Sequence, residues 1–446
     1  MFSQPFRECP FRLKKLCGAA SKGKEQSILI AELFRWLGRI ILGFSLLYGV
    51  YQAYISLHMF GEAPLPVPRK NDVHRFAVFV CARNEAGVLP LLLDSLAKQN
   101  YPHDAFDVFV TADNCTDDTA ALARQAGAVV FERTDPVHRG KGYALNWAFA
   151  RFFEQYAGRY DACCVFDADN VADGQFLAAM NRQLNAGQTI AVGYRMGKNP
   201  ADSWVAGCST LFWLMQTRLC FVPRVRMGIP CFSVGGTGFM FDLSVLGGKG
   251  WHTHSICEDI EFTLDSIAAG HFVAYAPDAV FYDEQPLRFG PSLRQRYRWS
   301  SGAVQVTGIS GPKLLRALFS RHKKVKVLDA FLYSFGTALT GVSGLTWCLA
   351  LVLNAVVGHR WKALPLIIVS SLVFSYISMA LCAMLILHLE KKKWPGRWKV
   401  VLTYPIYLLS WAVINVLVLF FRKPQWSVVP HTASLSIEEV EHTSMP

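Results

Sequence analysis

The sequence lacks the features of a disulfide-bonded secreted protein. Its 12 cysteines are scattered, and they form no Cys-x-x-Cys pair and no cluster with the spacing of metal ligands. Several lie inside apolar runs, where cysteine behaves as a small hydrophobic residue. No clear small-residue cleavage pattern follows the first hydrophobic segment, which argues against a cleavable signal peptide. We therefore expect a reduced, cytosolic main domain without disulfide bonds.

Charged residues are absent from four long segments. No Asp, Glu, Lys or Arg occurs in Ile40–Gly61, Ala330–Gly358, Ala363–Leu389 or Val400–Phe421. Each segment exceeds the roughly 20 residues that a helix needs to span the hydrocarbon core of a bilayer. Buried core helices are the alternative, but such helices are usually shorter. We expect one membrane segment within residues 28–61, with a short amphipathic lead-in, and three transmembrane helices within residues 327–421.

Acidic residues are in the minority: the sequence has 33 Asp and Glu but 45 Lys and Arg, which gives a net charge of +12. The basic residues cluster in a tail over residues 1–27, a stretch over 313–326 and a loop over 391–399. The positive-inside rule places the last two in the cytoplasm. Nothing resembles a nucleic-acid-binding module, so the charge favours anionic lipid headgroups as partners. We expect an integral protein of the plasma membrane with a cytoplasmic main domain.

The predicted crossings leave a conflict at both ends of the chain. One span before a cytoplasmic domain places the basic tail outside, against the positive-inside rule. Either that tail is translocated, or the first segment is re-entrant or interfacial. Three complete spans after the domain likewise place the C-terminal tail, residues 422–446, outside.

Residues 62–312 alternate between apolar runs and helical patterns. Strands are predicted at Phe76–Cys81, Phe106–Thr111, Ala128–Phe131, Cys163–Phe166, Thr189–Tyr194, Phe272–Ala276 and Val280–Tyr282, and helices at Val88–Gln99 and Tyr143–Gln155. Apolar runs without polar alternation are typical of parallel strands covered on both faces. This alternation predicts an α/β domain with a doubly wound, mostly parallel sheet.

Carboxylates follow two of these strands. Asp113 ends the second strand, and Asp167 and Asp169 end the run at Cys163–Phe166. Open α/β sheets bind ligands at the carboxyl ends of their strands. Two hard oxygen ligands beside a pyrophosphate suit Mg²⁺ or Mn²⁺ better than zinc. The alternative is a solvated turn, because Asp and Asn are common turn residues.

Three later stretches also admit two interpretations. The glycines around Thr237 either allow a ligand to approach the backbone or form a plain turn. Glu258 and Asp259 open a helix, where acids also simply complement the helix dipole. The basic helix at Ser292–Trp299 could lie on anionic lipid, which we expect of Arg294 and Arg296. The apolar, aromatic helix Trp204–Leu219 is interpreted as core or membrane-leaning surface.

The order of the motifs resembles that of the membrane-embedded family 2 glycosyltransferases, the group that contains cellulose, hyaluronan and chitin-oligosaccharide synthases. The motifs are Asp113, Asp167-x-Asp169, Glu258-Asp259 and Gln295-x-x-Arg298-Trp299. They occur between Arg75 and Val306, and each has the expected strand or helix context. Cys257 stands where the family has the Thr of Thr-Glu-Asp. The resemblance implies a GT-A fold in which a nucleotide-binding sheet is joined to an acceptor half.

The resemblance also implies roles for individual residues. The nucleotide-sugar would be bound by Ala82, Arg83, Glu85, Asp113, Lys141, Asp167, Gln295 and Arg298. Asp167 and Asp169 would hold Mg²⁺ or Mn²⁺. Asp259, beside Glu258, would be the catalytic base. The acceptor would lie against Gly236, Thr237 and Trp299. Trp426, His431 and Thr432 depart from the family's Trp…Thr-x-His order, which puts a role for that tail in doubt.

These roles predict an inverting, metal-dependent enzyme that uses a UDP-sugar and builds a β-linked polysaccharide. One alternative is transfer of a single sugar to a lipid. Another is a catalytically silent membrane scaffold or glycan-export component. The expected partners are the UDP-sugar, a glycan or lipid acceptor and membrane lipids, not nucleic acid, and a homo-oligomer is left open. Hydroxyl and aromatic side chains of the C-terminal spans either line a glycan path or, more often, pack helices together.

Overall fold

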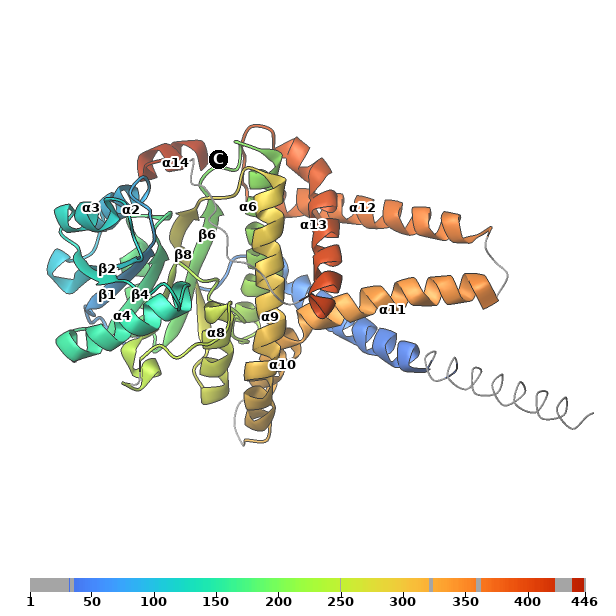
Figure 1. The fold of residues 1–446 in the computed structure, drawn as a ribbon, viewed down its shortest axis with the longest axis horizontal. Coiled ribbons are helices and arrows are strands. Elements are labelled where there is room, and N and C mark those ends of the chain that lie inside the picture. The colour runs from blue at the N-terminus through green and yellow to red at the C-terminus, as the bar shows by residue number, and fades with distance from the viewer. Residues whose placement is uncertain are drawn as a thin grey trace, which may run out of the picture.

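The structure is a computed structural model that describes residues 32, 36–248, 250–320, 324–357, 362–421 and 435–444. The basic tail, most of the expected lead-in, and Trp426, His431 and Thr432 lie outside these ranges. An α/β domain occupies one side of the molecule, and long helices project from its other side (Figure 1).

The apolar runs form an eight-stranded sheet of order β3-β2-β1-β4-β7-β6-β8-β5. The strands are β1 (Phe76–Ala82), β2 (Phe106–Asp113), β3 (Val129–Arg133), β4 (Ala162–Asp167), β5 (Val171–Ala172), β6 (Ile190–Gly197), β7 (Phe239–Asp242) and β8 (Val273–Asp283). β1 pairs in parallel with β2 and β4, and β6 with β8, whereas β7 is antiparallel to β4 and β6. The predicted α/β class with a mostly parallel sheet is confirmed.

The end of the sheet differs from the sequence prediction in one respect. The two strands expected at Phe272–Ala276 and Val280–Tyr282 are one strand, β8. Its pairing with β6 shifts in register between Gly193 and Tyr194. The prediction of two strands was wrong because Pro277 interrupts the apolar pattern of the sequence. The shift in register lets β8 continue through this proline as one strand.

Alternate side chains of β1 build a core on each face of the sheet, as the period of two in a strand requires. Phe76, Val78 and Val80 pack in one cluster with helices α2 (Leu89–Ala97) and α5 (Phe176–Asn185). Phe79 belongs to the other cluster, where it stacks on Phe149 of α4 (Lys141–Tyr156) at 4.4 Å between ring centroids. The same cluster takes in α6 (Trp204–Gln216) and α8 (Glu258–Ala269). A short helix, α3 (Thr119–Gln125), joins β2 to β3.

The parallel strands bring their polar ends to one edge of the sheet. β1 and β2 are each followed by an asparagine in the left-handed region, Asn84 with φ 57° and Asn114 with φ 53°. Asparagine tolerates this conformation better than most residues. The Asn84 side chain accepts a bond from the Thr116 amide at 2.8 Å, which ties the two loops together. The chain therefore turns sharply at this edge and leaves space beside β4.

Several helices are long and apolar enough to cross a membrane. In the described part of the chain these are Trp36–Met59, Trp204–Arg226, Leu364–Leu389 and Arg397–Phe420. The second comprises α6, the π-helical turn Thr217–Phe221 and α7 (Val222–Arg226), and 72% of its apolar 18-residue stretch is buried, so it is a core element. Two further helices link the domain to this region: α9 (Phe289–Leu318) and α10 (Lys324–Ser334).

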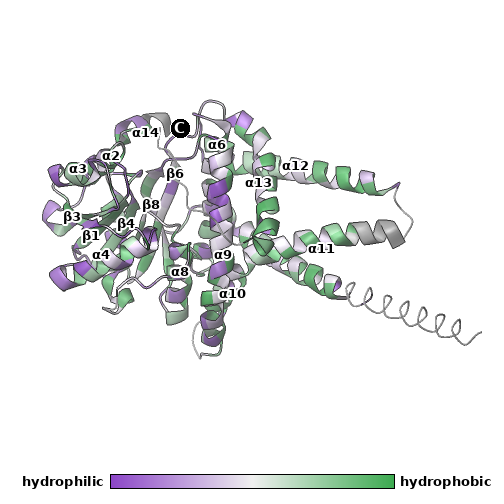
Figure 2. Cartoon of the chain, viewed as in Figure 1, coloured by the Kyte–Doolittle hydropathy of each residue, from purple (hydrophilic) through white to green (hydrophobic). Residues whose placement is uncertain are grey.

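The projecting helices have a common direction. The helix Trp36–Met59, α11 (Gly336–Val357) and α12 (Leu364–Leu389) leave the domain toward the same side, whereas α13 (Arg397–Phe420) runs across their bases beside α9 (Figure 1). The projecting helices are mostly hydrophobic, whereas α9 contains both hydrophobic and hydrophilic residues along its length (Figure 2). A last helix, α14 (Ile437–Ser444), returns to the α/β domain.

A buried polar cluster attaches the N-terminal membrane helix to the domain. Arg224 of α7 donates from Nε and Nη2 to Asp329 of α10, at 2.9 and 3.1 Å. Tyr51 of the N-terminal helix donates to the same carboxylate at 2.7 Å. The side chains of Arg224 and Asp329 are 0% and 1% exposed. Because neither charge reaches water, each depends on its partner.

Breaking this pair is expected to destabilise the protein strongly. In the variant Arg224→Ala, the Asp329 carboxylate remains buried without its partner, which typically costs about 3–5 kcal/mol. Thermal melting in detergent should show a clearly lower midpoint. The matched control is Arg226→Ala, because Arg226 is exposed and makes one bond, to the Glu62 carbonyl at 3.2 Å. Equal melting midpoints for the two variants would contradict the assigned role of the pair.

Candidate functional site

A cavity of about 780 Å³ lies at the polar edge of the sheet. Eleven of the residues predicted from the sequence line it: Arg83, Glu85, Lys141, Asp167, Asp169, Gly236, Glu258, Asp259, Gln295, Arg298 and Trp299. They come from the ends of β1 and β4, from the starts of α4 and α8, from the turn before β7 and from α9. Its volume lies in the range of pockets that bind small molecules and cofactors.

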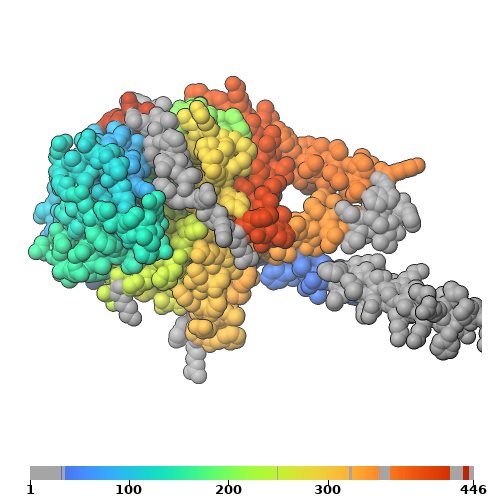
Figure 3. Space-filling view, viewed as in Figure 1, coloured from blue at the N-terminus to red at the C-terminus, as the bar shows by residue number. Residues whose placement is uncertain are grey.

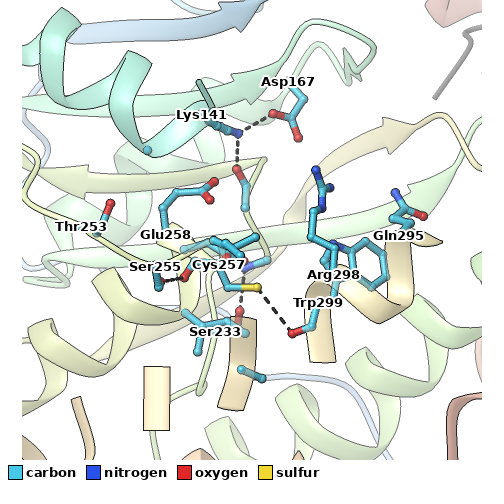
Figure 4. Close-up of a pocket in the computed structure, with 18 of the residues that line it drawn as sticks. Lys141, Asp167, Ser233, Thr253, Ser255, Cys257, Glu258, Gln295, Arg298 and Trp299 are labelled. Carbon is cyan, nitrogen blue, oxygen red and sulfur yellow. Dashed lines mark hydrogen bonds and ion pairs between the residues drawn. The ribbon is translucent and has the colours of Figure 1, made fainter. Parts of the chain in front are cut away.

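Lys141 joins the two halves of this cavity. Its Nζ forms an ion pair with Asp167 and donates to the Gly236 carbonyl at 2.6 Å (Figure 4). Burial lowers the pKa of Lys141, but the carboxylates of Asp167 and Glu258 outweigh it, so the pKa lies above its ordinary value. Lys141 is therefore charged at neutral pH. Its ammonium group and the Arg298 guanidinium, whose side chain extends toward the same space, can both face an anionic ligand (Figure 4).

Hydrogen bonds with Thr237 and Asn170 position the loop that carries the carboxylates at the end of β4. The Asp167 amide donates to the Thr237 hydroxyl at 2.9 Å. Asn170 donates from Nδ2 to Asp169 at 3.1 Å and to Asp283 at 3.0 Å, and Thr237 donates to the Asn170 side-chain oxygen. These bonds fix the loop and leave the Asp167 side chain 38% exposed toward the cavity.

The two carboxylates fit a hard divalent cation. Mg²⁺ is commonly held by one or two carboxylates, with phosphate and water oxygens completing its shell. Within the described ranges, no group of three or more His, Cys, Asp or Glu side chains is placed to hold a metal. A pair of carboxylates beside cationic groups therefore suits an ion that arrives with a phosphorylated ligand better than a structural zinc site.

Glu258 and Asp259 stand in the first turn of α8, where backbone amides normally stabilise negative charge. Burial nevertheless raises the pKa of Glu258, and the neighbouring Asp259 raises it further, to about 7. Burial also raises the pKa of Asp259, against the opposing effect of its backbone bonds and of Lys141. A carboxylate pair with raised pKa can accept a proton near neutral pH.

This arrangement predicts an acid limb in the pH profile of turnover. If deprotonated Asp259 accepts a proton, kcat/KM should fall as pH drops through about 7, because protons then occupy the pair. In Glu258→Gln the negative neighbour is lost, so the pKa of Asp259 should decrease and the limb should move to lower pH. The control is Glu154→Gln, an exposed acid outside the cavity. A limb at the same pH in wild type and Glu258→Gln would contradict the assignment.

The other end of the cavity is aromatic. Trp299 makes an edge contact with Trp213 of α6 at 5.7 Å and lies 6.1 Å from Trp411 of α13, between ring centroids. The Arg195 guanidinium lies over the Trp213 ring at 3.7 Å and forms an ion pair with Asp283. All five of these side chains line the cavity. Flat rings of this kind can lie against the C–H face of a sugar.

Sequence reasoning missed part of this wall. Arg195 and Trp213 were not singled out, and the helix containing Trp213 was interpreted as core or membrane-leaning surface. One face of that helix, with Phe212, Trp213 and Gln216, in fact lines the cavity. Arg195 follows the apolar start of β6 as Asp167 follows that of β4, so the polar end of this strand was a usable signal.

Three predicted residues do not line the cavity. Ala82 is buried at the end of β1. Asp113 is 5% exposed, and the Nη1 atom of Arg133 donates to it at 2.5 Å. Thr237 is 1% exposed and supports the loop after β4, as described above. Their predicted contacts with donor or acceptor remain predictions.

The expectation that Arg296 faces anionic lipid was wrong. Its side chain is fully buried, and it donates from Nη1 to the Tyr407 carbonyl at 2.9 Å and to the Ser410 hydroxyl at 2.8 Å. Its guanidinium also lies over the Tyr407 ring at 3.9 Å. The sequence correctly predicts that α9 is a basic, aromatic helix. It does not show that α13 packs over Arg296 and buries it.

An α/β fold with a mostly parallel sheet and an acidic, cation-flanked cavity at its strand ends is of the GT-A type. Residues 74–302 match the family described as "Glycosyltransferase like family 2". The match spans half of the chain, so the chain belongs to this family and is a glycosyltransferase. The resemblance seen in the sequence is thereby confirmed, and the catalytically silent alternative has no support.

Individual relatives agree with this assignment. The chain is 25% identical over 303 residues to the probable glycosyltransferase YdaM of Bacillus subtilis (strain 168), covering 65% of this chain and 68% of the relative. It is 22% identical over 307 residues to a poly-beta-1,6-N-acetyl-D-glucosamine synthase of Staphylococcus epidermidis, covering 67% and 68%. The fold is similar to that of a mannosyltransferase from Pyrobaculum calidifontis solved with GDP-Man and Mn²⁺. That comparison has a TM-score of 0.55 at 19% identity, and it covers 85% of this chain and 99% of the other.

Proposed function

We propose that this glycosyltransferase moves a sugar from a UDP-sugar to an acceptor hydroxyl with inversion at the anomeric carbon. The observation that carries the proposal is the convergence of Asp167, Asp259 and Arg298 on one cavity, although they are far apart in the sequence. A single base acting in a direct displacement turns an α-linked donor into a β-glycoside. The acceptor oxygen forms a bond to C1, the C1–O bond to the diphosphate breaks, and the acceptor proton passes to Asp259.

Each end of the cavity has a distinct part in this reaction. Arg298 offers a planar fork that matches phosphate oxygens, and Lys141 adds a second positive charge beside the leaving group. Asp167 and Asp169 would hold Mg²⁺ or Mn²⁺, which would neutralise charge on the departing diphosphate when bound. The solved mannosyltransferase contains Mn²⁺, which supports a divalent ion but does not identify the metal here. Gly236 has φ +80° and would bring a Cβ to 3.5 Å from Asp259, so its bare backbone leaves room beside the base.

The acceptor is proposed to be a growing glycan. Support comes from the aromatic end of the cavity, where Trp213, Trp299 and Trp411 can contact successive sugar rings, and from the polysaccharide synthase among the relatives. The second candidate is transfer of one sugar to a lipid. It is favoured by the fact that Tyr333, Thr337 and Trp411, which line that end, belong to the helices on the membrane side of the domain.

The test is a donor panel with product analysis. Full-length protein in lipid nanodiscs would receive radiolabelled UDP-sugars and GDP-mannose with Mn²⁺, and nucleotide release, product size and anomeric configuration would be measured. The proposal predicts one or few UDP-sugars as donors and a β-linked, water-soluble ladder. An organic-soluble product with one added sugar would replace the glycan acceptor by the lipid acceptor. Turnover of GDP-mannose alone, or an α-linked product, would overturn the proposal.

A further inference from the structure

The last long apolar helix, α13, runs beside a helix that cannot cross a membrane. Trp411 of α13 donates to Ser300 of α9 at 2.9 Å, and Ser300 donates to Asn415 of α13 at 2.8 Å. Together with the bonds from Arg296 to Tyr407 and Ser410, these contacts extend over about one turn of α9 and about two turns of α13. Arg294, Gln295, Arg296 and Arg298 stand within one turn of α9, which is far too polar for the hydrocarbon core.

Both ends of α13 contact the domain rather than opposite sides of a bilayer. Near its start, Thr403 lies 3.4 Å from the Cys208 sulfur of α6, measured from its hydroxyl. At its end, the Tyr297 hydroxyl of α9 donates to the Phe421 carbonyl. A helix of 24 residues is about 36 Å long, which exceeds the roughly 30 Å of the hydrocarbon core, so a crossing helix would carry one end into the opposite headgroup region. Neither end of α13 leaves the region of α6 and α9.

One face of α13 is apolar and exposed along its whole length. The exposed residues follow one another by three or four positions, which places them on a single stripe: Trp398, Leu402, Ile406, Leu409, Val413, Leu417 and Phe420. The opposite face is buried and includes Val400, Tyr404, Tyr407, Ile414 and Val418, of which the first three belong to the core cluster of the domain. Seven large apolar side chains in a row exceed what a soluble surface usually exposes. Acyl chains are the environment that suits such a stripe.

The chain on either side of α13 also lies with the domain. At the end of α12, Glu390 accepts from Arg218 at 2.5 Å and from the Tyr194 hydroxyl at 2.7 Å. After α13, Val440 of α14 is fully buried against the domain, and Glu438 pairs with Lys98 at 2.6 Å. Since α11 leaves the domain and α12 returns to it, the two helices form one hairpin (Figure 1).

We infer that α13 lies in the plane of the membrane, with its exposed stripe (residues 398–420) against the acyl chains beneath the headgroups on the domain's side. Of the described helices that follow the domain, only α11 and α12 then cross the bilayer, and the C-terminal helix α14 stays on the same side as the domain. Lys391, Lys393 and Lys399 flank the start of α13 and would meet anionic headgroups.

This topology differs from the three spans and external tail expected from the sequence. α12 and α13 are similar in length and apolar content, and the sequence does not show which surface covers each. Figure 3 shows open space between α11 and α12 where they leave α13, consistent with helices that are surrounded by lipid. Trp411, in the wall of the cavity, then lies at the membrane surface.

Reporter fusions to the full chain test the side of the tail. Alkaline phosphatase is active only outside the cytoplasm, and green fluorescent protein fluoresces in it. After Pro446 the inference predicts fluorescence without phosphatase activity, and between residues 358 and 363 it predicts the reverse. Equal behaviour at the two positions, or an active phosphatase after Pro446 with a fluorescent protein at 358–363, would overturn it.

A depth measurement tests the orientation of α13 itself. Nitroxide labels would be placed singly at Leu402, Ile406, Leu409, Val413 and Leu417, in protein without its native cysteines, and at Leu366, Val369, Val373, Ile377 and Leu381 of α12 as controls. Oxygen and nickel-chelate accessibility would report depth in vesicles of phosphatidylcholine and phosphatidylglycerol. We expect a uniform shallow depth along α13 and a maximum in the middle of α12. A mid-helix maximum on α13 would overturn the inference, and neither test depends on sugar transfer.

Discussion

Replacing Asp259 with asparagine is expected to lower sugar transfer by about 10²–10⁴-fold while leaving UDP affinity unchanged. General base catalysis contributes on this scale, and an amide cannot accept the proton of the acceptor hydroxyl. Nucleotide affinity should persist because Arg298, Lys141 and Asp167 are untouched. The measurement combines product formation with isothermal titration of UDP in the presence of Mn²⁺. The backbone bonds at the start of α8 do not need the charge, so the fold should survive.

The same helix offers a matched control for this substitution. Asp265 also belongs to α8 and lies outside the cavity; its partly exposed side chain pairs with Lys313 at 2.6 Å and accepts from the Ser310 hydroxyl at 2.8 Å, a bond that the oxygen of asparagine can also accept. Exposed pairs of this kind usually contribute little to stability. Asp265→Asn should therefore retain near-normal turnover. Transfer by Asp259→Asn at the level of Asp265→Asn would remove Asp259 from the role of base.

Removing the second carboxylate of the pair after β4 should have a comparable effect through the metal. In Asp169→Ala, one of two carboxylate ligands is lost, and we expect UDP affinity to become insensitive to Mn²⁺ and turnover to fall by about 10³-fold or more. Metal ions of this kind contribute several kcal/mol of charge stabilisation at the leaving group, and each 1.36 kcal/mol is a factor of ten in rate. Titration of UDP with and without Mn²⁺ separates the two effects.

A nearby aspartate serves as the control for this second substitution. Asp173 accepts a bond from the Gln175 amide at 2.8 Å and does not line the cavity. Asp173→Ala should keep the response of UDP binding to Mn²⁺. If Asp169→Ala also kept it, the ion would have to be held elsewhere or be dispensable, and the proposed site would be wrong.

Much of the candidate site could be predicted because its motifs are local. Asp167 and Asp169 directly follow an apolar strand, and a parallel strand must present its carboxyl end at the ligand edge. Glu258 and Asp259 begin a helix, and Arg298 and Trp299 follow Gln295 at a fixed spacing. Each motif can therefore be recognised from residues that are close together in the sequence. The family match over residues 74–302 then confirmed what the order of these motifs had indicated.

The aromatic end of the cavity could not be predicted in the same way. Trp213, Trp299 and Trp411 come from three helices, and only their packing brings the rings together. Arg296 shows the same limit, because its sequence neighbours give a cationic helix face while α13 buries it. Contacts between distant segments depend on geometry that no local pattern encodes.

By itself, the sequence determined the α/β domain, most residues of the candidate site and the presence of long apolar helices, because strand pattern, motif spacing and missing charge are local properties. Only the tertiary structure decided which apolar helix is a buried element of the domain, which ones project from it and which lies along α9. The four helices that are long and apolar enough to cross a membrane have similar lengths, from 23 to 26 residues. Their surroundings differ, and these depend on the side chains that other parts of the chain bring to each helix face.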